Sequence, residues 1–258
     1  MTTVAVIIAR SGSKGLENKS MQLLAGKPLI AWTIEHALGS QAVDHVVLSS
    51  DCPQIRSVAA RYGIIRYERP ADRSTDSTTI DDGARHGIEC WEAQFNAMCD
   101  YAVILYGNVP LRPVNLTDLA MKKMIETEAD SVQSVCPVGK MHPFWMKKLA
   151  GPTEDVLQMY EDNCIYRRQD LPPIYMPDGG VIAVTRKNLF NVDPADPHAF
   201  LGNDRRAIKT QPGQVVDVDD RVDLALAAAV LKVLYTDFVA EPPPGSAWSE
   251  RFAGRAVG

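Results

Sequence analysis

The chain has 258 residues, of which 46% are hydrophobic and 23% are charged, the composition of an ordinary globular protein. This length fits one large domain, or a domain with a sizeable excursion, and is ample for a buried core. The net charge is −5 and no basic run is present, which argues against binding to nucleic acid or to an anionic membrane surface.

The cysteines and the apolar stretches bear on the compartment. The five cysteines have no C-x-x-C spacing, and their odd number argues against a disulfide framework. The first apolar run is interrupted at Arg10, so it is not a secretory signal, and no apolar stretch is long enough to span a bilayer. We therefore expect a cytoplasmic protein with free thiols.

Strand-like and helix-like segments alternate along most of the chain. Apolar, β-branched runs predict buried strands over 4–9, 44–50, 64–67, 101–106, 131–137 and 179–185. Apolar residues at helical spacing predict helices over 28–38, 53–62, 78–95, 116–128 and 221–236. This alternation indicates βαβ units and an α/β fold with a mainly parallel sheet, in which ligands bind beyond the carboxyl ends of the strands.

The alternation stops between about 139 and 176, a stretch rich in Pro, Met, Tyr and Trp. A lid, a disordered insert and an arm that packs on a second subunit are the candidates, and the aromatic content is too high for disorder. We predict a single domain over 1–240 that contains this excursion, followed by an extended tail over 241–258 with a run of three prolines.

A basic, glycine-containing loop follows the first predicted strand. Within ten residues it has two glycines, two hydroxyls and three cations: Arg10, Ser11, Gly12, Ser13, Lys14, Gly15 and Lys19. Glycines let backbone N–H groups approach anionic oxygens, and the cations neutralise charge that amides cannot. The loop is neither a Walker A motif nor a dinucleotide fingerprint. It predicts a triphosphate site, and the alternative is a solvated loop with ordinary surface charges.

Two carboxylates lie two residues apart near the end of the predicted domain, Asp217 and Asp219. On a strand they would share one face and repel each other unless a cation lay between them. This suggests Mg²⁺ or Mn²⁺ bound together with substrate phosphates. The alternative is that Asp219 and Asp220 cap the last helix while Asp217 is solvated. Asp223 is expected to organise the start of that helix or to support the metal ligands from behind.

These segments resemble those of the CMP-sugar-acid synthetases, the acylneuraminate cytidylyltransferases and their relatives. The resemblance covers about residues 3–233 and rests on these motifs: Ala9-Arg10-Ser11-Gly12-Ser13-Lys14-Gly15, Gly26-Lys27-Pro28-Leu29, Arg69-Pro70-Ala71-Asp72, Pro110-Leu111-Arg112, Arg168-Gln169-Asp170-Leu171-Pro172 and the Asp217–Leu224 segment. It implies a three-layer α/β/α nucleotidyltransferase-like fold, whose excursion makes a homodimer interface and closes over the partner's site. It also implies attack on the α-phosphorus of CTP by an acidic acceptor, first of all a keto-deoxy sugar acid, with release of pyrophosphate.

The resemblance also implies roles on the nucleotide side. The cations Arg10, Lys14 and Lys19 stabilise the charge of the triphosphate as catalytic groups, and the rest of the loop lines it. The cytosine end is held by Arg69 and by the hydroxyls of the pair Thr78 and Thr79. The family usually has Asn where this chain has Ser20, so base recognition is expected to be relaxed while CTP stays preferred. The metal ligands are Asp217 and Asp219.

On the acceptor side, Arg168 matches an arginine that contacts the acid substrate in the family. Three other positions depart from the family pattern. Tyr106 stands where a glutamine helps to hold the sugar acid, Asp178 replaces an asparagine, and Asn108 occupies the place of a metal-binding aspartate of nucleotide-sugar pyrophosphorylases. We therefore keep a phosphonate or another small acid as the second choice of acceptor. A catalytically silent nucleotide-binding regulatory protein is the rival from another class.

Overall fold

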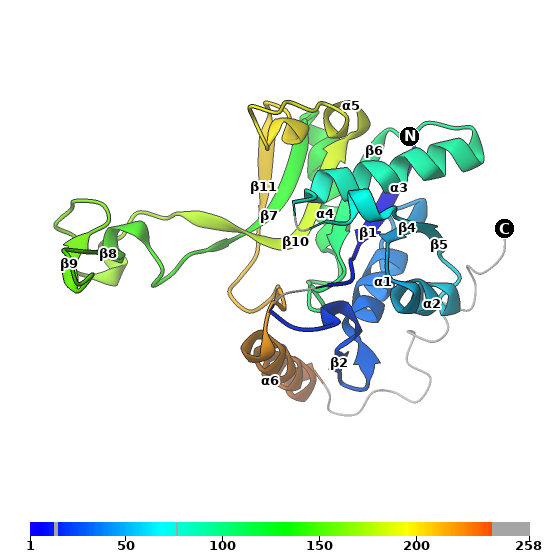
Figure 1. Ribbon diagram of the computed structural model, residues 1–258. Helices are drawn as coiled ribbons and strands as arrows, with labels where there is room; N and C mark the ends of the chain where they lie inside the picture. The colour runs from blue at the N-terminus through cyan, green and yellow to red at the C-terminus, as the bar shows by residue number, and fades with distance from the viewer. Residues whose placement is uncertain (13–14, 76, 239–258) are drawn as a thin grey trace.

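A computed structural model describes residues 1–12, 15–75 and 77–238 (Figure 1). A seven-stranded sheet forms its centre, with the strand order β11-β7-β10-β6-β1-β4-β5. In chain order these strands are β1 (Thr3–Ile8), β4 (His45–Ser50), β5 (Ile65–Glu68), β6 (Tyr101–Tyr106), β7 (Ser131–Pro137), β10 (Tyr175–Thr185) and β11 (Arg205–Lys209). Only β10 runs antiparallel to its neighbours within this sheet. The predicted α/β fold with a mainly parallel sheet is confirmed.

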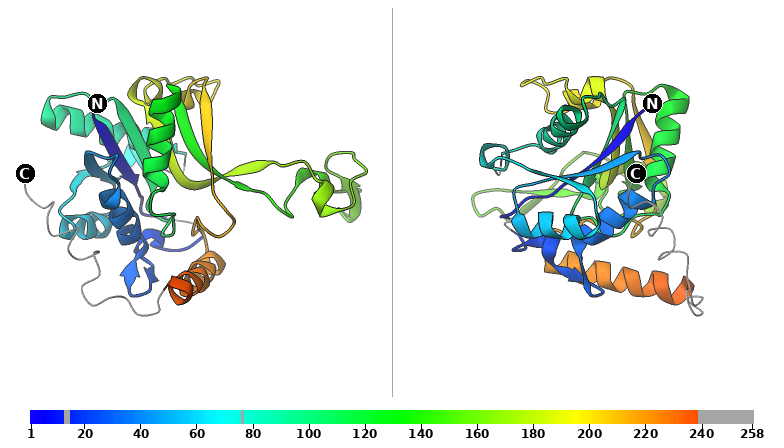
Figure 2. Two further views of the ribbon diagram at one scale, coloured as in Figure 1. Left: turned by 180° about the vertical axis from the view of Figure 1, so that it is seen from behind. Right: turned by 90° about the vertical axis from the view of Figure 1, so that its right-hand side faces the viewer.

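Helices cover both faces of the sheet and make three layers (Figures 1 and 2). They are α1 (Leu29–Gly39), α2 (Pro53–Arg61), α3 (Ile80–Phe95), α4 (Leu116–Thr127) and the short α5 (Arg186–Leu189). The last helix, α6 (Arg221–Phe238), lies apart from the sheet and packs in a third cluster with Leu24 and Leu29 (Figure 1). Because side chains of a strand alternate between faces, β1 supplies both cores. Its Ala5 and Ile7 pack with α1, α2 and α4, whereas Val4 and Val6 pack with α3 and α5.

Most predicted boundaries lie within two residues of those in the structure, and the strands over 101–106 and 131–137 agree at both ends. The helix predicted from 78 begins at Ile80, because Thr79 is its N-cap and accepts a hydrogen bond from the Asp82 N–H at 3.4 Å. The strand predicted from 179 begins at Tyr175, because β10 continues its ladder with β7 beyond the body of the sheet.

Residues 138–174, here called the arm, project far from the rest of the molecule between β7 and β10 (Figures 1 and 2). The arm holds a hairpin of β8 (Lys147–Ala150) and β9 (Val156–Met159), and the turns η3 (Pro143–Trp145) and η4 (Arg168–Asp170). Many of its large apolar side chains are exposed: Met141, Met146, Leu149, Val156, Leu157, Tyr160 and Tyr166. The arm therefore carries an apolar surface that its own fold does not bury.

The rest of the chain adds small elements around the sheet. A short hairpin of β2 (Leu23–Leu24) and β3 (Lys27–Pro28) precedes α1. Across the described ranges, no helix has both the length and the apolar character needed to cross a bilayer. The tail predicted over 241–258 lies outside the described residues.

Candidate functional site

Three chain segments meet beyond the carboxyl ends of β1 and β6. The backbone N–H of Val218 donates to the carbonyl of Asn108 at 3.0 Å, which joins the segment before α6 to the loop after β6. The loop after β1 lies close to both of these segments. A methyl group at Gly15 would lie 2.6 Å from the carbonyl oxygen of Asp219, in the segment before α6. A methyl group at Gly107, in the loop after β6, would lie 2.9 Å from the Ala9 Cβ. Glycine is therefore required at both positions for this close approach.

The carboxylates of Asp217 and Asp219 meet at the side chain of Asn108. The strand alternation predicted for them is wrong, because the described residues around them form no sheet strand and pair instead with the loop after β6. That pairing nevertheless brings the two side chains together. The Asn108 amide donates to Asp217 Oδ1 and lies 3.5 Å from Asp219 Oδ1.

The charges of this cluster are coupled. Burial, followed by the negative charge of Asp219, raises the pKa of Asp217 to about 6, and the cations Lys19 and Arg112 act in the opposite direction. Lys19 belongs to the turn η1 (Lys19–Met21), and its Nζ lies 2.6 Å from Asp219 Oδ1. The structure thus brings together four predicted site residues: Lys19, Asn108, Asp217 and Asp219.

The two aspartates that follow have a separate role. Asp220 Oδ1 accepts from the backbone N–H groups of Val222 (2.7 Å) and Asp223 (2.9 Å), which caps α6. Asp223 Oδ2 accepts from the N–H groups of Asp219 (2.9 Å) and Asp220 (3.1 Å), so its expected role at the helix start is confirmed. The alternative in which Asp219 also caps this helix and Asp217 is solvated is wrong, since Asp219 pairs with Lys19 and Asp217 is half-buried.

The loop after β1 is held by groups from neighbouring strands. Ser11 donates its N–H to Asp51 Oδ1 at 2.9 Å and its hydroxyl to Asp51 Oδ2. Arg69 donates from Nη2 to the Ala9 carbonyl at 3.1 Å. Gly12 adopts the left-handed conformation, with φ +68°, that glycine tolerates without strain. The predicted phosphate ligands Ser13 and Lys14 lie outside the described residues.

The residues predicted for the base lie around the start of α3 and the turn η1. Arg69 is buried, which lowers the pKa of its guanidinium, and its Nε donates to Ser74 at 3.0 Å. Thr78 accepts from the Thr75 N–H at 3.0 Å, and Thr79 caps α3. Ser20 is buried within η1. The base contacts of these side chains remain predictions.

Tyr106, at the end of β6, is adjacent to the carboxylate pair. A methyl group at Gly179 would lie 3.3 Å from the Tyr106 ring and 3.5 Å from Asp217 Oδ2, so these three groups adjoin. Burial, and then the charge of Asp217, raises the pKa of Tyr106 to about 12, which keeps its hydroxyl protonated at neutral pH.

Asp178 is engaged by its own chain. It accepts hydrogen bonds from the Ser134 hydroxyl, from the Gly180 N–H at 2.9 Å and from the Thr210 hydroxyl at 2.5 Å. These bonds tie β7, β10 and the end of β11 together. A substrate contact of Asp178 remains a prediction.

Arg112 was not predicted as a site residue, although it belongs to the Pro110-Leu111-Arg112 motif. It donates to the carbonyls of Tyr106 (3.0 Å), Val109 and Gly180 (2.6 Å) and to Thr33 Oγ1 (3.1 Å). Burial lowers its pKa to about 9, against the attraction of nearby carboxylates that include Asp217. Arg112 therefore fixes the end of β6 at Tyr106 and the loop that follows it, which carries Asn108.

Arg168 lies on η4, within the arm that projects from the rest of the molecule (Figure 1). It is exposed, and its Nη2 would lie 3.9 Å from a methyl group at Gly139, at the base of the arm. The acceptor residues are thus divided between the body and the arm.

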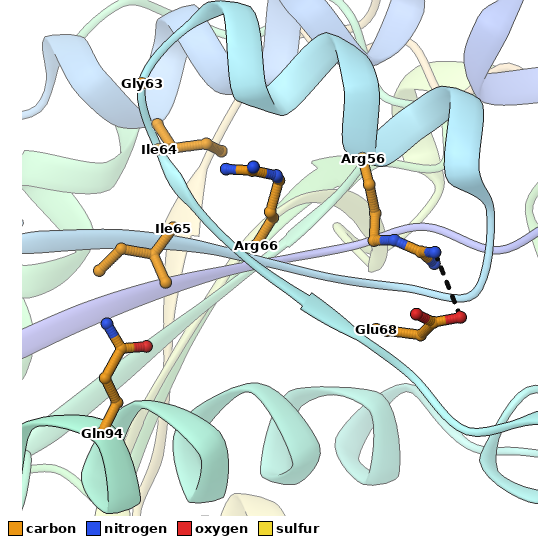
Figure 3. A pocket seen from close by; sticks show the side chains of 7 residues that line it. All are labelled: Arg56, Gly63, Ile64, Ile65, Arg66, Glu68 and Gln94. Atoms are coloured by element: carbon orange, nitrogen blue, oxygen red, sulfur yellow. Dashed lines mark ion pairs between the residues drawn. The ribbon is translucent and has the colours of Figure 1, made fainter.

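A pocket elsewhere on the surface has no part in this cluster. It lies at the edge strand β5 and is lined by Arg56, Gly63, Ile64, Ile65, Arg66, Glu68 and Gln94 (Figure 3). Arg56 and Glu68 form an ion pair of 3.2 Å across it. None of the predicted site residues lines this pocket, so it offers no competing centre for the predicted chemistry.

A mainly parallel sheet with a basic loop after its first strand, and paired carboxylates at a neighbouring loop, are the features expected of a nucleotidyltransferase. Solved structures agree with this fold. The chain is similar to a CMP:2-keto-3-deoxy-manno-octonic acid synthetase complexed with CTP, with a TM-score of 0.66 and 18% identity over 91% of this chain and 100% of that one. It is also similar to the 4-diphosphocytidyl-2C-methyl-D-erythritol synthase of Anaerococcus prevotii, with a TM-score of 0.59 and 12% identity over 90% of this chain and 98% of that one.

The sequence places the chain more narrowly. The cytidylyltransferase family model matches residues 4–180, so the chain belongs to the cytidylyltransferase family and is a nucleotidyltransferase that uses CTP. It is 29% identical to the pseudaminic acid cytidylyltransferase of Campylobacter jejuni, over 90% of this chain and 97% of the relative. It is also 29% identical to the CMP-N,N'-diacetyllegionaminic acid synthase of Legionella pneumophila, over the same shares.

A third relative differs in length. The chain is 33% identical to the N-acylneuraminate cytidylyltransferase of Streptococcus agalactiae over 86% of this chain but only 52% of the relative. The chain thus spans about half the length of that protein. The predicted membership of the CMP-sugar-acid synthetase family is confirmed by these matches.

Proposed function

We propose that this protein transfers CMP from CTP to a keto-deoxy sugar acid of the acylneuraminate kind and releases pyrophosphate. An acceptor oxygen would attack the α-phosphorus as the bond to the bridging oxygen of pyrophosphate breaks. The observation that carries this proposal is the cluster of Lys19, Asn108, Asp217 and Asp219 in a chain of the cytidylyltransferase family. The relatives that align over nearly their whole length are named for sugar acids, which supports this class of acceptor.

The nucleotide would lie along the loop after β1. Arg10, Lys14 and Lys19 would neutralise the triphosphate and the charge that develops on the leaving pyrophosphate. The cytosine would lie toward Arg69, Thr78 and Thr79. The ammonium of Lys19 pairs with Asp219 at 2.6 Å. Exchange of a carboxylate for phosphate oxygens at Lys19 would accompany binding.

The donor set between the loops fits a hard divalent cation such as Mg²⁺ or Mn²⁺. Asp217 and Asp219 provide two carboxylates, and the Asn108 amide contacts Asp217 directly. The pKa of Asp217 is raised by burial and by the negative charge of Asp219. A bound cation would offset the cost of burying the charged carboxylate and would reduce the repulsion between the two carboxylates. No group of three or more His, Cys, Asp or Glu side chains suited to a metal occurs within the described ranges, so substrate phosphates would complete the coordination. When bound, the cation would supply charge stabilisation to the phosphates.

The acceptor would lie beside Tyr106 and Asn108, with Asp178 behind them. Arg168 would reach its carboxylate from the arm of a second copy of the chain, since the arm of one copy extends away from its own site. The exposed apolar side chains of the arm support a homodimer, because a monomer would leave them in water. The guanidinium fork of Arg168 suits a carboxylate bidentately.

A pyrophosphate-release assay tests this proposal. Each of the four nucleoside triphosphates would be combined with a panel of acids that includes acylneuraminate-type sugar acids, phosphonates and other small acids. We expect turnover with CTP and a sugar acid in the presence of Mg²⁺. Turnover with a phosphonate and with none of the sugar acids would instead assign a phosphonate as the acceptor. The melting temperature with each nucleoside triphosphate and Mg²⁺ tests the base preference, and equal or larger stabilisation by UTP or ATP would contradict the preference for CTP.

A further inference from the structure

An acidic side chain, Asp51, lies directly against the loop that we propose binds the triphosphate. It follows β4 and accepts both the N–H (2.9 Å) and the hydroxyl of Ser11. Negative charge at this place weakens phosphate binding by repulsion. A carboxylate here is therefore useful only if the geometry it imposes on the loop outweighs that repulsion.

The position of Asp51 extends the pairing of two strands. The parallel ladder between β1 and β4 ends at the pair Ile8 and Ser49, and the N–H of Ala9 still donates to the Ser49 carbonyl at 3.3 Å. Among the described residues past this point, no ladder bond joins the chain after β1 to β4, and the Asp51 side chain makes the connection instead. It holds Ser11, the last residue before the left-handed turn at Gly12.

Arg69 is the second anchor of the loop and the counter-charge of Asp51. Its backbone N–H donates to the Ser50 carbonyl at 3.1 Å, and its Nη2 donates to the Ala9 carbonyl at 3.1 Å. Asp51 raises the pKa of Arg69 against the effect of burial, which shows that the two charges attract each other. A buried cation therefore offsets part of the repulsion between Asp51 and a phosphate.

We infer that Asp51 is a positioning residue for CTP, and that the Ser11 hydroxyl is its partner and not a ligand of the triphosphate. Asp51 fixes Ser11, and with it the entry to the left-handed turn at Gly12, in a conformation suited to the phosphates. This inference rests on the proposed function of the loop. It replaces the direct nucleotide contact predicted for the Ser11 hydroxyl with a contact inside the protein.

The chain offers a matched control at the other end of the same two strands. Asp44, just before β4, accepts the backbone N–H of Thr3 at 2.8 Å. Asp44 and Asp51 thus make the same kind of bond from β4 to β1, one at each end. Only Asp51 lies at the proposed nucleotide site, so a comparison of the two separates positioning from general stabilisation.

The test measures the Kd of CTP by calorimetry, the KM and kcat, and the melting temperature for the wild type and five variants. These are Asp51→Ala, Asp51→Asn, Ser11→Ala, the double variant Asp51→Ala/Ser11→Ala, and Asp44→Ala. We expect Asp51→Ala to raise the Kd and KM of CTP about tenfold with kcat within about twofold, as for the loss of a hydrogen bond to a charged group. Asp51→Asn keeps an acceptor for the Ser11 N–H and should recover most of the affinity.

The remaining variants decide between the readings. Ser11→Ala should raise the Kd of CTP. The double variant should have the same Kd for CTP as Asp51→Ala, because the two residues act as one unit. Asp44→Ala should lower the melting temperature and leave the Kd of CTP unchanged. Three results would overturn this inference and leave the proposed function standing. They are an unchanged Kd of CTP in Asp51→Ala, increases in Kd from Ser11→Ala and Asp51→Ala that multiply in the double variant, and an equal increase in Kd in Asp44→Ala. A wild-type protein that does not bind CTP would overturn the proposed function as well.

Discussion

The body of the molecule and its arm bury their apolar side chains to very different degrees. In the body, Ile7, Leu105 and Met121 are at most 1% exposed, between helices on both faces of the sheet. In the arm, Leu149 is 60% exposed and Leu157 is 69% exposed, on a two-stranded hairpin. A two-stranded hairpin is marginal by itself in water.

The contrast separates two kinds of function. The proposed nucleotide and metal groups lie on loops held by the sheet and by buried hydrogen bonds, as in the contacts of Arg112. Arg168, proposed for the acceptor, lies on the arm, which we propose packs on a second copy of the chain. All groups proposed to bind CTP and the metal ion would therefore come from one chain, while binding of the acceptor would also need the arm of a second copy. Each of the following predictions tests one side of this comparison.

The largest effect is expected in the body, from loss of either carboxylate. Asp217→Asn and Asp219→Asn should each lower kcat about 100-fold or more, as for the loss of a key electrostatic group. Folding should survive, because removal of one of two repelling carboxylates relieves repulsion. Steady-state kinetics with CTP at saturating Mg²⁺, together with thermal melts, measures both.

Asp220→Asn is the control for the carboxylate pair. Asparagine is also a good N-cap, so the cap on α6 should persist and activity should change little. Equal losses in all three variants would contradict the separation of the pair from the helix cap.

Acid should destabilise the body through His36. This side chain hydrogen-bonds Thr117 at 2.9 Å, and burial, with a smaller effect of Arg112, lowers its pKa to about 3. Between pH 6.5 and pH 3, His36 is protonated in the unfolded chain but stays neutral in the folded protein. The free energy of unfolding therefore falls as the pH drops through this range. The loss from this group between pH 7 and pH 5 should be about 2 kcal/mol. Urea unfolding at both pH values measures it.

His36→Asn isolates that contribution, because asparagine does not titrate. The variant should be less stable than the wild type at pH 7 but should lose about 2 kcal/mol less between pH 7 and pH 5. Parallel losses in the two proteins would show that His36 does not contribute to the pH dependence.

On the arm, Arg168→Ala should lower kcat/KM for the acceptor about tenfold and leave the KM of CTP unchanged, because only a charge-assisted contact to the acid is lost. If the arm acts on the partner's site, mixed dimers of Arg168→Ala and Asp219→Asn contain one intact site. An equimolar, re-equilibrated mixture should then recover about a quarter of wild-type activity. Absence of recovery in mixed dimers would place Arg168 and Asp219 in the same chain's site.

The smallest effect is expected from a single apolar side chain of the arm. Leu157→Ser should raise the dimer dissociation constant about fivefold, because one truncated interface side chain rarely removes more than about 1 kcal/mol. Val192→Ser is the control, since Val192 is 62% exposed but lies outside the arm. Light scattering against concentration measures both, and the wild type should approach twice 28.3 kDa. A wild type that stays monomeric at micromolar concentration would contradict the role of the arm.

Much of the fold could be predicted because its signals are local. The apolar runs at Tyr101–Tyr106 and Ser131–Pro137 are strands with the same ends that the sequence predicts. Gly63 has a φ of +70° at the end of α2, as its place after the helical pattern indicates. Such features depend on the periodicity and on the conformational freedom of a few neighbouring residues, both of which the sequence displays directly.

The candidate site depended on contacts that local patterns do not contain. Asp217 and Asp219 converge because their segment pairs with the loop after β6, more than 100 residues away, and not because they lie on a strand. The partner of Ser11, Asp51, is 40 residues distant. The sequence by itself determined which residue types follow which strands. The strand order and the loop packing decided which of these side chains meet, because hydrogen bonds and ion pairs form only between groups that the tertiary fold brings within about 3 Å.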